Sequence, residues 1–180
     1  MKFKFKPLIL FLIVPFFFSC TDNLDFDQIN LDIEPIFDTP LVFFELDQND
    51  FFDEDNGVEI QVVTDITDLT VLESSTVREN LGRVDLFFEV SNQFDRFFRV
   101  EVDFLDTNDN ITFSFDPLFI RPGQTDFSLN QNVIISDNPN FLNSSRVRVT
   151  VNLSPSGVIL DPDIPRIFRF KSAGRFYLSF

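Results

Sequence analysis

A strict alternation of apolar and polar residues is the feature of this chain that most constrains its fold. Residues 84–90, 98–104 and 147–153 each carry valine, leucine or phenylalanine at every second position. Because successive side chains of a β-strand point to opposite faces, this spacing gathers the apolar side chains on one face. Each of these segments is therefore predicted to be a strand with one buried face.

Shorter or less regular apolar segments extend the pattern along the chain. We predict strands at residues 41–46, 58–63, 66–72, 84–90, 98–104, 111–115, 127–129, 133–135 and 147–153, followed by a strand pair or one bent strand at 168–170 and 176–180. Many short strands separated by turn residues are typical of a β-sandwich. The predicted fold is all-β: an antiparallel β-sandwich, Ig-like or related, with about 7–9 strands and at most one short helix.

Two connections are predicted in more detail. Residues 92–95 are expected to join the first two alternating segments into an antiparallel hairpin. The single helix is expected over residues 74–81, with Ser75 or Thr76 as its N-cap and Glu79 completing a capping box.

The amino terminus has the pattern of an export signal. Three lysines lie within the first six residues, and residues 8–18 form an apolar run. The run is shorter than the about 20 residues that a membrane-spanning helix needs. A basic start followed by a short apolar run is instead typical of a secretory signal peptide.

The end of this signal carries a specific resemblance. The residues Phe17-Phe18-Ser19-Cys20 resemble a bacterial lipobox, and Cys20 is the only cysteine of the chain. The resemblance implies that the Cys20 sulfur is diacylated and that Cys20 becomes the first residue of the mature protein. An ordinary signal peptide with a cysteine near its cleavage site is the alternative.

The residues after Cys20 bear on location. Lipoproteins retained in the inner membrane carry Asp at the second mature position, whereas this chain has Thr21. Asp22, Asp25 and Asp27 follow and resemble the acidic surface-export signals of Bacteroidota lipoproteins. The chain thus resembles small lipoproteins of Bacteroidota, which implies an outer-membrane lipoprotein that faces the periplasm or the cell surface.

The predicted organisation has three parts: a signal peptide at residues 1–19, an acidic tether at 20–38 and a single β-sandwich domain at 39–180. The signal contains three lysines and no acid, so its removal lowers the net charge from −15 to −18. So acidic a chain is not expected to bind nucleic acid, because phosphate contacts need lysine and arginine. The acyl chains are expected to be its attachment to the membrane.

The residue types that are missing exclude much enzyme chemistry. The chain has no histidine, and Cys20 is its only thiol. Nucleophilic mechanisms that depend on a histidine base and histidine-ligated metal sites are therefore excluded. Paired carboxylates, or a divalent ion held by oxygen, are the chemistries that remain. We expect that the protein catalyses no reaction. A carboxylate-dependent hydrolase is the second of the two alternatives given at the end of this section.

An acidic loop at residues 47–57 is the candidate metal site. Asp53, Asp55 and Glu59 are spaced like the first ligands of a calcium loop, although the full EF-hand pattern is absent. A solvated acidic loop is the competing interpretation, and no other cofactor is expected. Residues 106–110 (Asp-Thr-Asn-Asp-Asn) resemble the calcium linker of cadherin repeats, but a hairpin turn explains them better.

Aromatic and basic residues supply the candidate binding surfaces. Phe87 and Phe97 lie on the nominally polar face of the expected hairpin. They form either a binding patch or a pair of residues that the tether or the acidic loop covers.

Basic residues gather near the carboxyl end, at Arg146, Arg148, Arg169, Lys171 and Arg175. We favour their neutralisation across strands by acids such as Asp85, Glu89, Glu101 and Asp103. A basic patch for an acidic glycan, a lipid A phosphate or a partner protein is the alternative.

These observations lead to one expected function and two alternatives. The expected function is a lipid-anchored cell-envelope protein with a binding or scaffolding β-sandwich, whose partners are the membrane and an envelope protein or glycan. The first alternative is a calcium- or glycan-binding surface module. The second is the carboxylate-dependent hydrolase.

Overall fold

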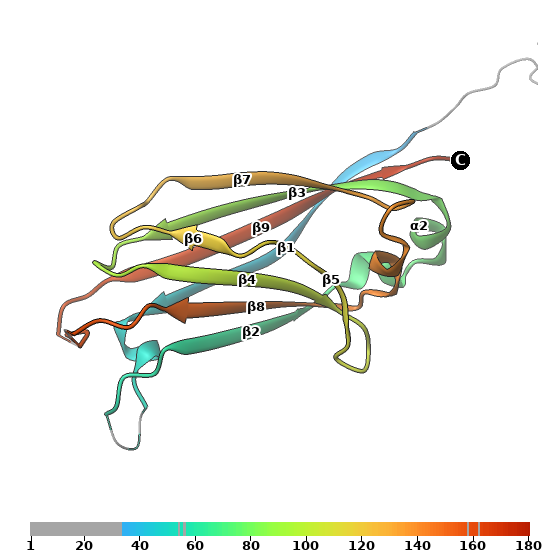
Figure 1. Ribbon diagram of the computed structural model, residues 1–180. Helices are drawn as coiled ribbons and strands as arrows, with labels where there is room; N and C mark the ends of the chain where they lie inside the picture. Colours follow the sequence, from blue (N-terminus) through green and yellow to red (C-terminus); the bar gives the residue numbers. More distant parts are fainter. Residues whose placement is uncertain (1–33, 54, 56, 158, 162) are drawn as a thin grey trace, which may run out of the picture. The chain divides into compact units, whose positions relative to one another are not determined.

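Nine strands in two facing antiparallel sheets make up the part of the chain that the structure describes (Figure 1). The computed structural model describes residues 34–53, 55, 57–157, 159–161 and 163–180. The predicted signal peptide, Cys20 and the tether up to residue 33 lie outside the described residues. The all-β prediction is confirmed, with one short α-helix, α2 (Ser75–Asn80), among the described residues.

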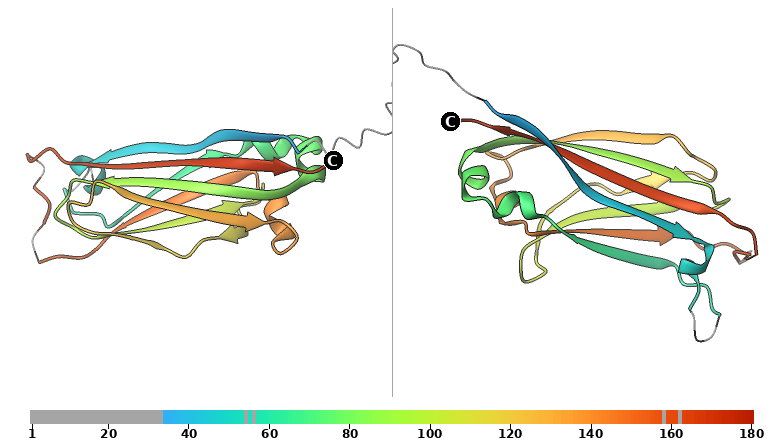
Figure 2. Two further views of the ribbon diagram at one scale, coloured as in Figure 1. Left: turned by 90° about the horizontal axis from the view of Figure 1, so that it is seen from above. Right: turned by 180° about the vertical axis from the view of Figure 1, so that it is seen from behind.

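The first sheet, here sheet I, has the strand order β1-β9-β3-β7. Its strands are β1 (Ile36–Asp47), β9 (Ile167–Leu178), β3 (Leu81–Asn92) and β7 (Phe127–Ile134). The right-hand view of Figure 2, from behind, shows β1 and β9 running side by side. Their pairing extends from Ile36 opposite Tyr177 to Asp47 opposite Ile167. β9 is one continuous strand, which decides between the strand pair and the single strand expected there.

The second sheet, sheet II, has the order β2-β8-β4-β5, and β6 pairs with β4 further along. Its strands are β2 (Val62–Asp68), β8 (Arg146–Leu153), β4 (Phe98–Leu105), β5 (Ile111–Ser114) and β6 (Leu118–Ile120). Short 3-10 turns lie at η3 (Gln48–Phe51), η4 (Thr70–Glu73) and η5 (Pro139–Asn143). The predicted strand at 58–63 is wrong over most of its length, because β2 begins at Val62.

Phenylalanine fills the space between the sheets. The fully buried phenylalanines are Phe51, Phe88, Phe94, Phe98, Phe104, Phe141, Phe168, Phe170 and Phe176. Phe98 of sheet II meets Phe168 of sheet I with ring centroids 4.6 Å apart. Alternation along β3, β4 and β9 turns six of these side chains inward, whereas Phe51, Phe94 and Phe141 enter the core from η3, the connection after β3 and η5. The inner faces thus supply most of the core, as the pattern predicted.

The helix α2 is present, but its cap is not the predicted one. The Ser74 side chain, rather than Ser75 or Thr76, accepts a hydrogen bond from the backbone N–H of Val77. The third helical residue is therefore Val77, which cannot complete a capping box as Glu79 was expected to do.

The predicted hairpin between residues 84–90 and 98–104 is wrong. β3 pairs with β7 and β9 in sheet I, whereas β4 pairs with β5, β6 and β8 in sheet II. The connection after β3 crosses from one sheet to the other. Alternation alone is the same for a hairpin and for two strands in facing sheets, so the sequence pattern did not distinguish them.

The side chain of Asn92 organises this crossing. Its amide nitrogen donates to the carbonyl oxygens of Arg96, at 2.9 Å, and Arg121, at 2.7 Å. Its side-chain oxygen accepts the backbone N–H of Phe94 at 2.8 Å. Asn92 and Phe94 are both fully buried, so the corner joins a satisfied polar group to an aromatic side chain in the core.

Candidate functional site

The outer face of sheet I carries the candidate site, and a β-bulge in β1 shapes it. The pairing register of β1 with β9 shifts between Pro40 and Val42. A bulge adds one residue on one strand and so changes which side chains face outward beyond it. Val42 is consequently buried, and Phe43 points out of the sheet with 62% of its surface exposed.

The register places two aromatic side chains on either side of β9. Pro40 of β1 lies opposite Ala173, and Ala173 lies opposite Phe87 of β3. The next outward row joins Phe43 to Lys171 of β9. The small Ala173 side chain leaves a hollow of about 350 Å³, which Phe43 and Phe87 both line. This is called the aromatic hollow below.

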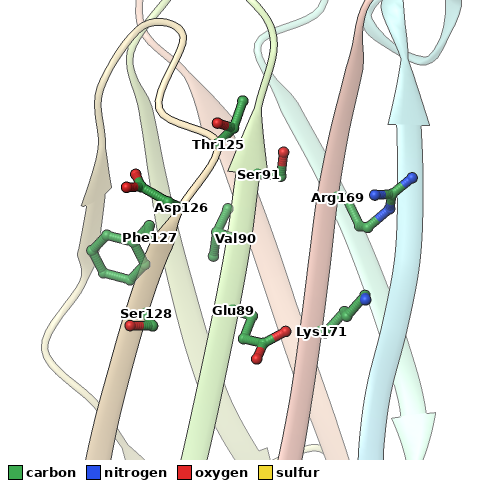
Figure 3. Close-up of a pocket in the computed structure, with 9 residues that line it drawn as sticks. All are labelled: Glu89, Val90, Ser91, Thr125, Asp126, Phe127, Ser128, Arg169 and Lys171. Atoms are coloured by element: carbon green, nitrogen blue, oxygen red, sulfur yellow. The ribbon is translucent and has the colours of Figure 1, made fainter.

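A second hollow continues from the first along the same face. Glu89 lies opposite Lys171 on the neighbouring strand, and both residues line the two hollows. The second hollow, called the polar hollow, has a volume of about 300 Å³. Its other polar lining side chains are Ser91, Thr125, Asp126, Ser128 and Arg169. In Figure 3 the Glu89 carboxylate reaches from β3 toward the strand that carries Lys171.

Ion pairs bound the two hollows. Arg175 donates two hydrogen bonds to Asp38, at 2.7 and 2.8 Å, and its guanidinium lies 5.7 Å from the centre of the Phe87 ring. At the other end, Arg169 pairs with Glu45. In both pairs, the arginine of β9 lies directly opposite its acidic partner on β1.

The predicted neutralisation of basic residues across strands is therefore present, with partly different acids. Arg148 pairs with the expected Asp103 at 2.7 Å, whereas Arg169 and Arg175 pair with acids of β1 that the sequence had not indicated. Arg146 pairs with Asp109 at 2.9 Å. Lys171 is the exception, because neither its side chain nor that of Glu89 forms an ion pair or hydrogen bond within the described part of the chain.

The ion pair between Asp38 and Arg175 shifts the titration of the Asp38 carboxyl to lower pH. The hydrogen bonds from Arg175, together with its positive charge, lower the pKa of the Asp38 carboxyl. A pKa that is lower in the folded state stabilises the fold at pH above the ordinary carboxyl range. This contribution disappears as the pH falls through the lowered pKa. The groups are solvent-exposed, so we expect an effect on titration rather than a large effect on stability.

We predict that Arg175→Gln raises the pKa of Asp38 toward its ordinary value. The neutral amide removes the charge that favours the ionised carboxyl. The measurement is a carboxyl ¹³C NMR titration of both proteins. Asp106 is the internal control, because hydrogen bonds from Asn110, in the turn between β4 and β5, lower its pKa independently of Arg175. An unchanged midpoint for Asp38, or an equal change at Asp106, would contradict the prediction.

The two phenylalanines predicted as one binding patch lie on different sheets. Phe87 belongs to β3 in sheet I, and Phe97 directly precedes β4 in sheet II with 56% of its surface exposed. The aromatic neighbour of Phe87 across the hollow is Phe43, which sequence reasoning missed. Residues 40–44 are apolar without interruption, so their pattern did not show which of them faces outward. A binding role for Phe87 or Phe97 stays a prediction.

The three candidate calcium ligands are not brought together. The side chain of Asp53 accepts the backbone N–H of Asp55 at 2.9 Å, a local turn. Glu59 instead pairs with Arg96 at 3.2 Å and accepts the backbone N–H of Leu160. Within the described residues, no group of three or more acidic or thiol side chains is placed to hold a metal ion. The geometry of Asp53, Asp55 and Glu59 thus gives calcium no support.

The segment that resembles a cadherin linker is a tight turn between β4 and β5. The Asp106 side chain accepts the backbone N–H groups of Asn108, at 2.7 Å, and Asn110, at 2.9 Å. Asp109 has a φ angle of 65°, a conformation that Asp and Asn tolerate. The hairpin-turn interpretation is supported.

Cys20, the predicted membrane attachment, lies outside the described residues. In the described part of the chain, no helix has the length and apolar character needed to cross a bilayer.

Comparison with known proteins adds similarity of structure only. No family model matches the chain, and no curated protein matches it. A protein of Parabacteroides distasonis that is predicted to be secreted is similar with a TM-score of 0.48 and 10% identity, over 64% of this chain and 38% of that one. The infectious bursal disease virus protein of T=1 particles is similar with a TM-score of 0.47 and 10% identity, over 82% of this chain and 32% of that one.

A third solved structure is a Bacillus endospore appendage, which forms disulfide-linked pili. It is similar with a TM-score of 0.34 and 10% identity, over 82% of this chain and 92% of that one. The chain spans less than half the length of the Parabacteroides and viral proteins. Similarities of this strength carry no conclusion about what the chain binds or does.

Proposed function

We propose that this chain is a lipid-anchored cell-envelope protein that performs no catalysis and binds a partner through the outer face of sheet I. The observation that carries the proposal is the pair of adjoining hollows on that face. They combine exposed aromatic surface at Phe43 with the charged groups of Lys171 and Glu89, which have no partner among the described residues. A site of this kind, apolar with a few convergent polar groups, is typical of ligand recognition.

The anchor in this proposal is Cys20. The lipobox-like residues before it, the preceding apolar run and the absence of any other cysteine support lipidation there. The absence of histidine supports a binding role over histidine-dependent nucleophilic catalysis and histidine-ligated metal chemistry. Thr21, which stands where lipoproteins of the inner membrane carry Asp, supports an outer-membrane position in the same proposal.

We predict that Cys20→Ala abolishes the incorporation of labelled palmitate and moves the protein out of the membrane fraction. The thiol is the acyl acceptor, and an alanine side chain offers no atom to acylate. Thr21→Ala is the matched control and is expected to keep the label. Undiminished labelling of the Cys20→Ala protein would refute the lipid anchor.

The binding face has its own test in cells. A photoreactive amino acid at Phe43 is expected to form adducts with an envelope component, because this exposed side chain lines the aromatic hollow. The same residue at Phe119, on sheet II and 68% exposed, is the control of similar accessibility. If position 43 yields no more adduct than position 119, sheet I is not the binding face.

A further inference from the structure

We propose that the outer face of sheet I binds an uncharged glycan, with one sugar ring over Ala173 between Phe43 and Phe87 and the next in the polar hollow. This inference rests on the proposed function, because it names the ligand class of the same site.

The aromatic hollow selects the apolar face of a sugar. Phenylalanine has no hydrogen-bonding group, so Phe43 and Phe87 contact only apolar surface favourably. In a pyranose whose hydroxyls are equatorial, such as glucose, both ring faces are lined by C–H groups and the hydroxyls radiate from the edge. Ala173 between the two aromatic side chains leaves room for such a flat ring.

The polar groups beside it match the edge of that ring. Lys171 supplies three donors and Glu89 supplies two acceptor oxygens. They lie opposite each other on adjacent strands, and no hydrogen bond or ion pair occupies either of them within the described residues. Neighbouring sugar hydroxyls, which donate and accept, satisfy both groups together.

The polar hollow extends the site beyond one ring. It shares Lys171 and Glu89 with the aromatic hollow and adds the hydroxyls of Ser91, Thr125 and Ser128. Each hollow is at the lower end of the size range of small-molecule sites. Two adjoining hollows of this size fit consecutive units of an oligosaccharide better than the broad surface of a folded protein partner.

The charged side chains on this face of sheet I favour an uncharged glycan. Arg169 and Arg175 are neutralised by Glu45 and Asp38, and Lys171 faces Glu89, so the groove presents no excess of positive charge. The whole chain carries a net charge of −15, which repels polyanions. The basic patch needed for an acidic glycan or a lipid phosphate is therefore absent from this face.

One property of the sequence makes the test direct. Apart from the three lysines of the signal segment, Lys171 is the only lysine of the chain. Reductive ¹³C-methylation of the processed, lipidated protein in detergent therefore places an NMR probe between the two hollows, and the dimethylated amine keeps its charge and one N–H donor. Lys171→Arg identifies the signal by deleting it.

The probes are maltohexaose, cellohexaose, mannohexaose and xylohexaose, with hexagalacturonate as the charged comparison. We expect at least one neutral hexasaccharide to shift the Lys171 signal in a saturable way, and hexagalacturonate to leave it unchanged. Phe43→Ala is expected to raise the dissociation constant by about tenfold or more, whereas Phe119→Ala leaves it unchanged. Both variants should keep the melting temperature of the parent protein, because both side chains are exposed.

Several results would overturn the inference. The inference fails if none of the four neutral hexasaccharides shifts the Lys171 signal, or if hexagalacturonate alone shifts it. It also fails if Phe43→Ala does not weaken binding. Cleavage of the hexasaccharide would contradict it too and would indicate a hydrolase. Blank glycans together with a protein adduct from position 43 would refute the glycan but leave the proposed function standing. Absent palmitate labelling and absent adducts would refute the proposed function itself.

Discussion

Replacing Arg96 by methionine is expected to lower the free energy of unfolding by about 3–5 kcal/mol. The Arg96 and Glu59 side chains are only 8% and 12% exposed, and their ion pair is 3.2 Å long. Arg96 also donates to the carbonyl oxygen of Ser154, so it connects three segments of the chain. Without the guanidinium, Glu59 keeps a largely buried carboxylate whose remaining donor among the described residues is the backbone N–H of Leu160.

Urea denaturation monitored by circular dichroism measures this loss. Arg99→Met is the matched control, because the pair of Arg99 with Glu101 is more exposed and should contribute about 1 kcal/mol or less. Adding Glu59→Gln to Arg96→Met should recover part of the loss by removing the buried charge. If Arg96→Met costs no more than Arg99→Met, the pair does not stabilise the fold.

Asn92→Ala is expected to destabilise the protein by about 3 kcal/mol, because it leaves several buried polar groups unsatisfied. The backbone N–H of Phe94 loses its acceptor, and the carbonyls of Arg96 and Arg121 lose a donor. Asn92 is fully buried, so water cannot readily replace these bonds. The chain crosses between the sheets at this corner, and both sheets should therefore lose support.

The same denaturation experiment measures the Asn92 effect. Asn132→Ala, on the exposed outer face of β7, is the control and should change stability by about 0.5 kcal/mol or less. Asn92→Asp should be no better than Asn92→Ala, because it sets a carboxylate against two carbonyl oxygens. Equal stability of Asn92→Ala and Asn132→Ala would show that the corner does not depend on this amide.

The strands with the clearest alternation were predicted well. β3, β4 and β8 each contain the predicted segments, and their apolar side chains are buried. The predictions at 127–129 and 133–135 merged into the single strand β7, whose middle residues are polar on both faces. Alternation fails there because β7 lies at the edge of sheet I, where burial demands less of the side chains.

The candidate site was predicted only in pieces. Phe87 was singled out for a binding patch, whereas Lys171 and Glu89 were singled out for charge neutralisation across strands. Phe43 was not singled out, because the bulge between Pro40 and Val42 decides its orientation. Asp38 and Glu45 were missed as partners of Arg175 and Arg169, because the pairing of β1 with β9 joins residues far apart in the sequence.

By itself, the sequence determined the all-β class, the inward faces of the central strands, the exclusion of histidine chemistry and the expectation of a lipid anchor at Cys20. These follow from local spacing and residue type, which one segment shows on its own. Only the tertiary structure decided which strands share a sheet, where β1 shifts its register and which charges meet across strands. Those features depend on pairing between distant segments, and a period of two is compatible with many pairings. The aromatic hollow arises in this way, since Phe43 and Phe87 become neighbours only when β9 lies between them.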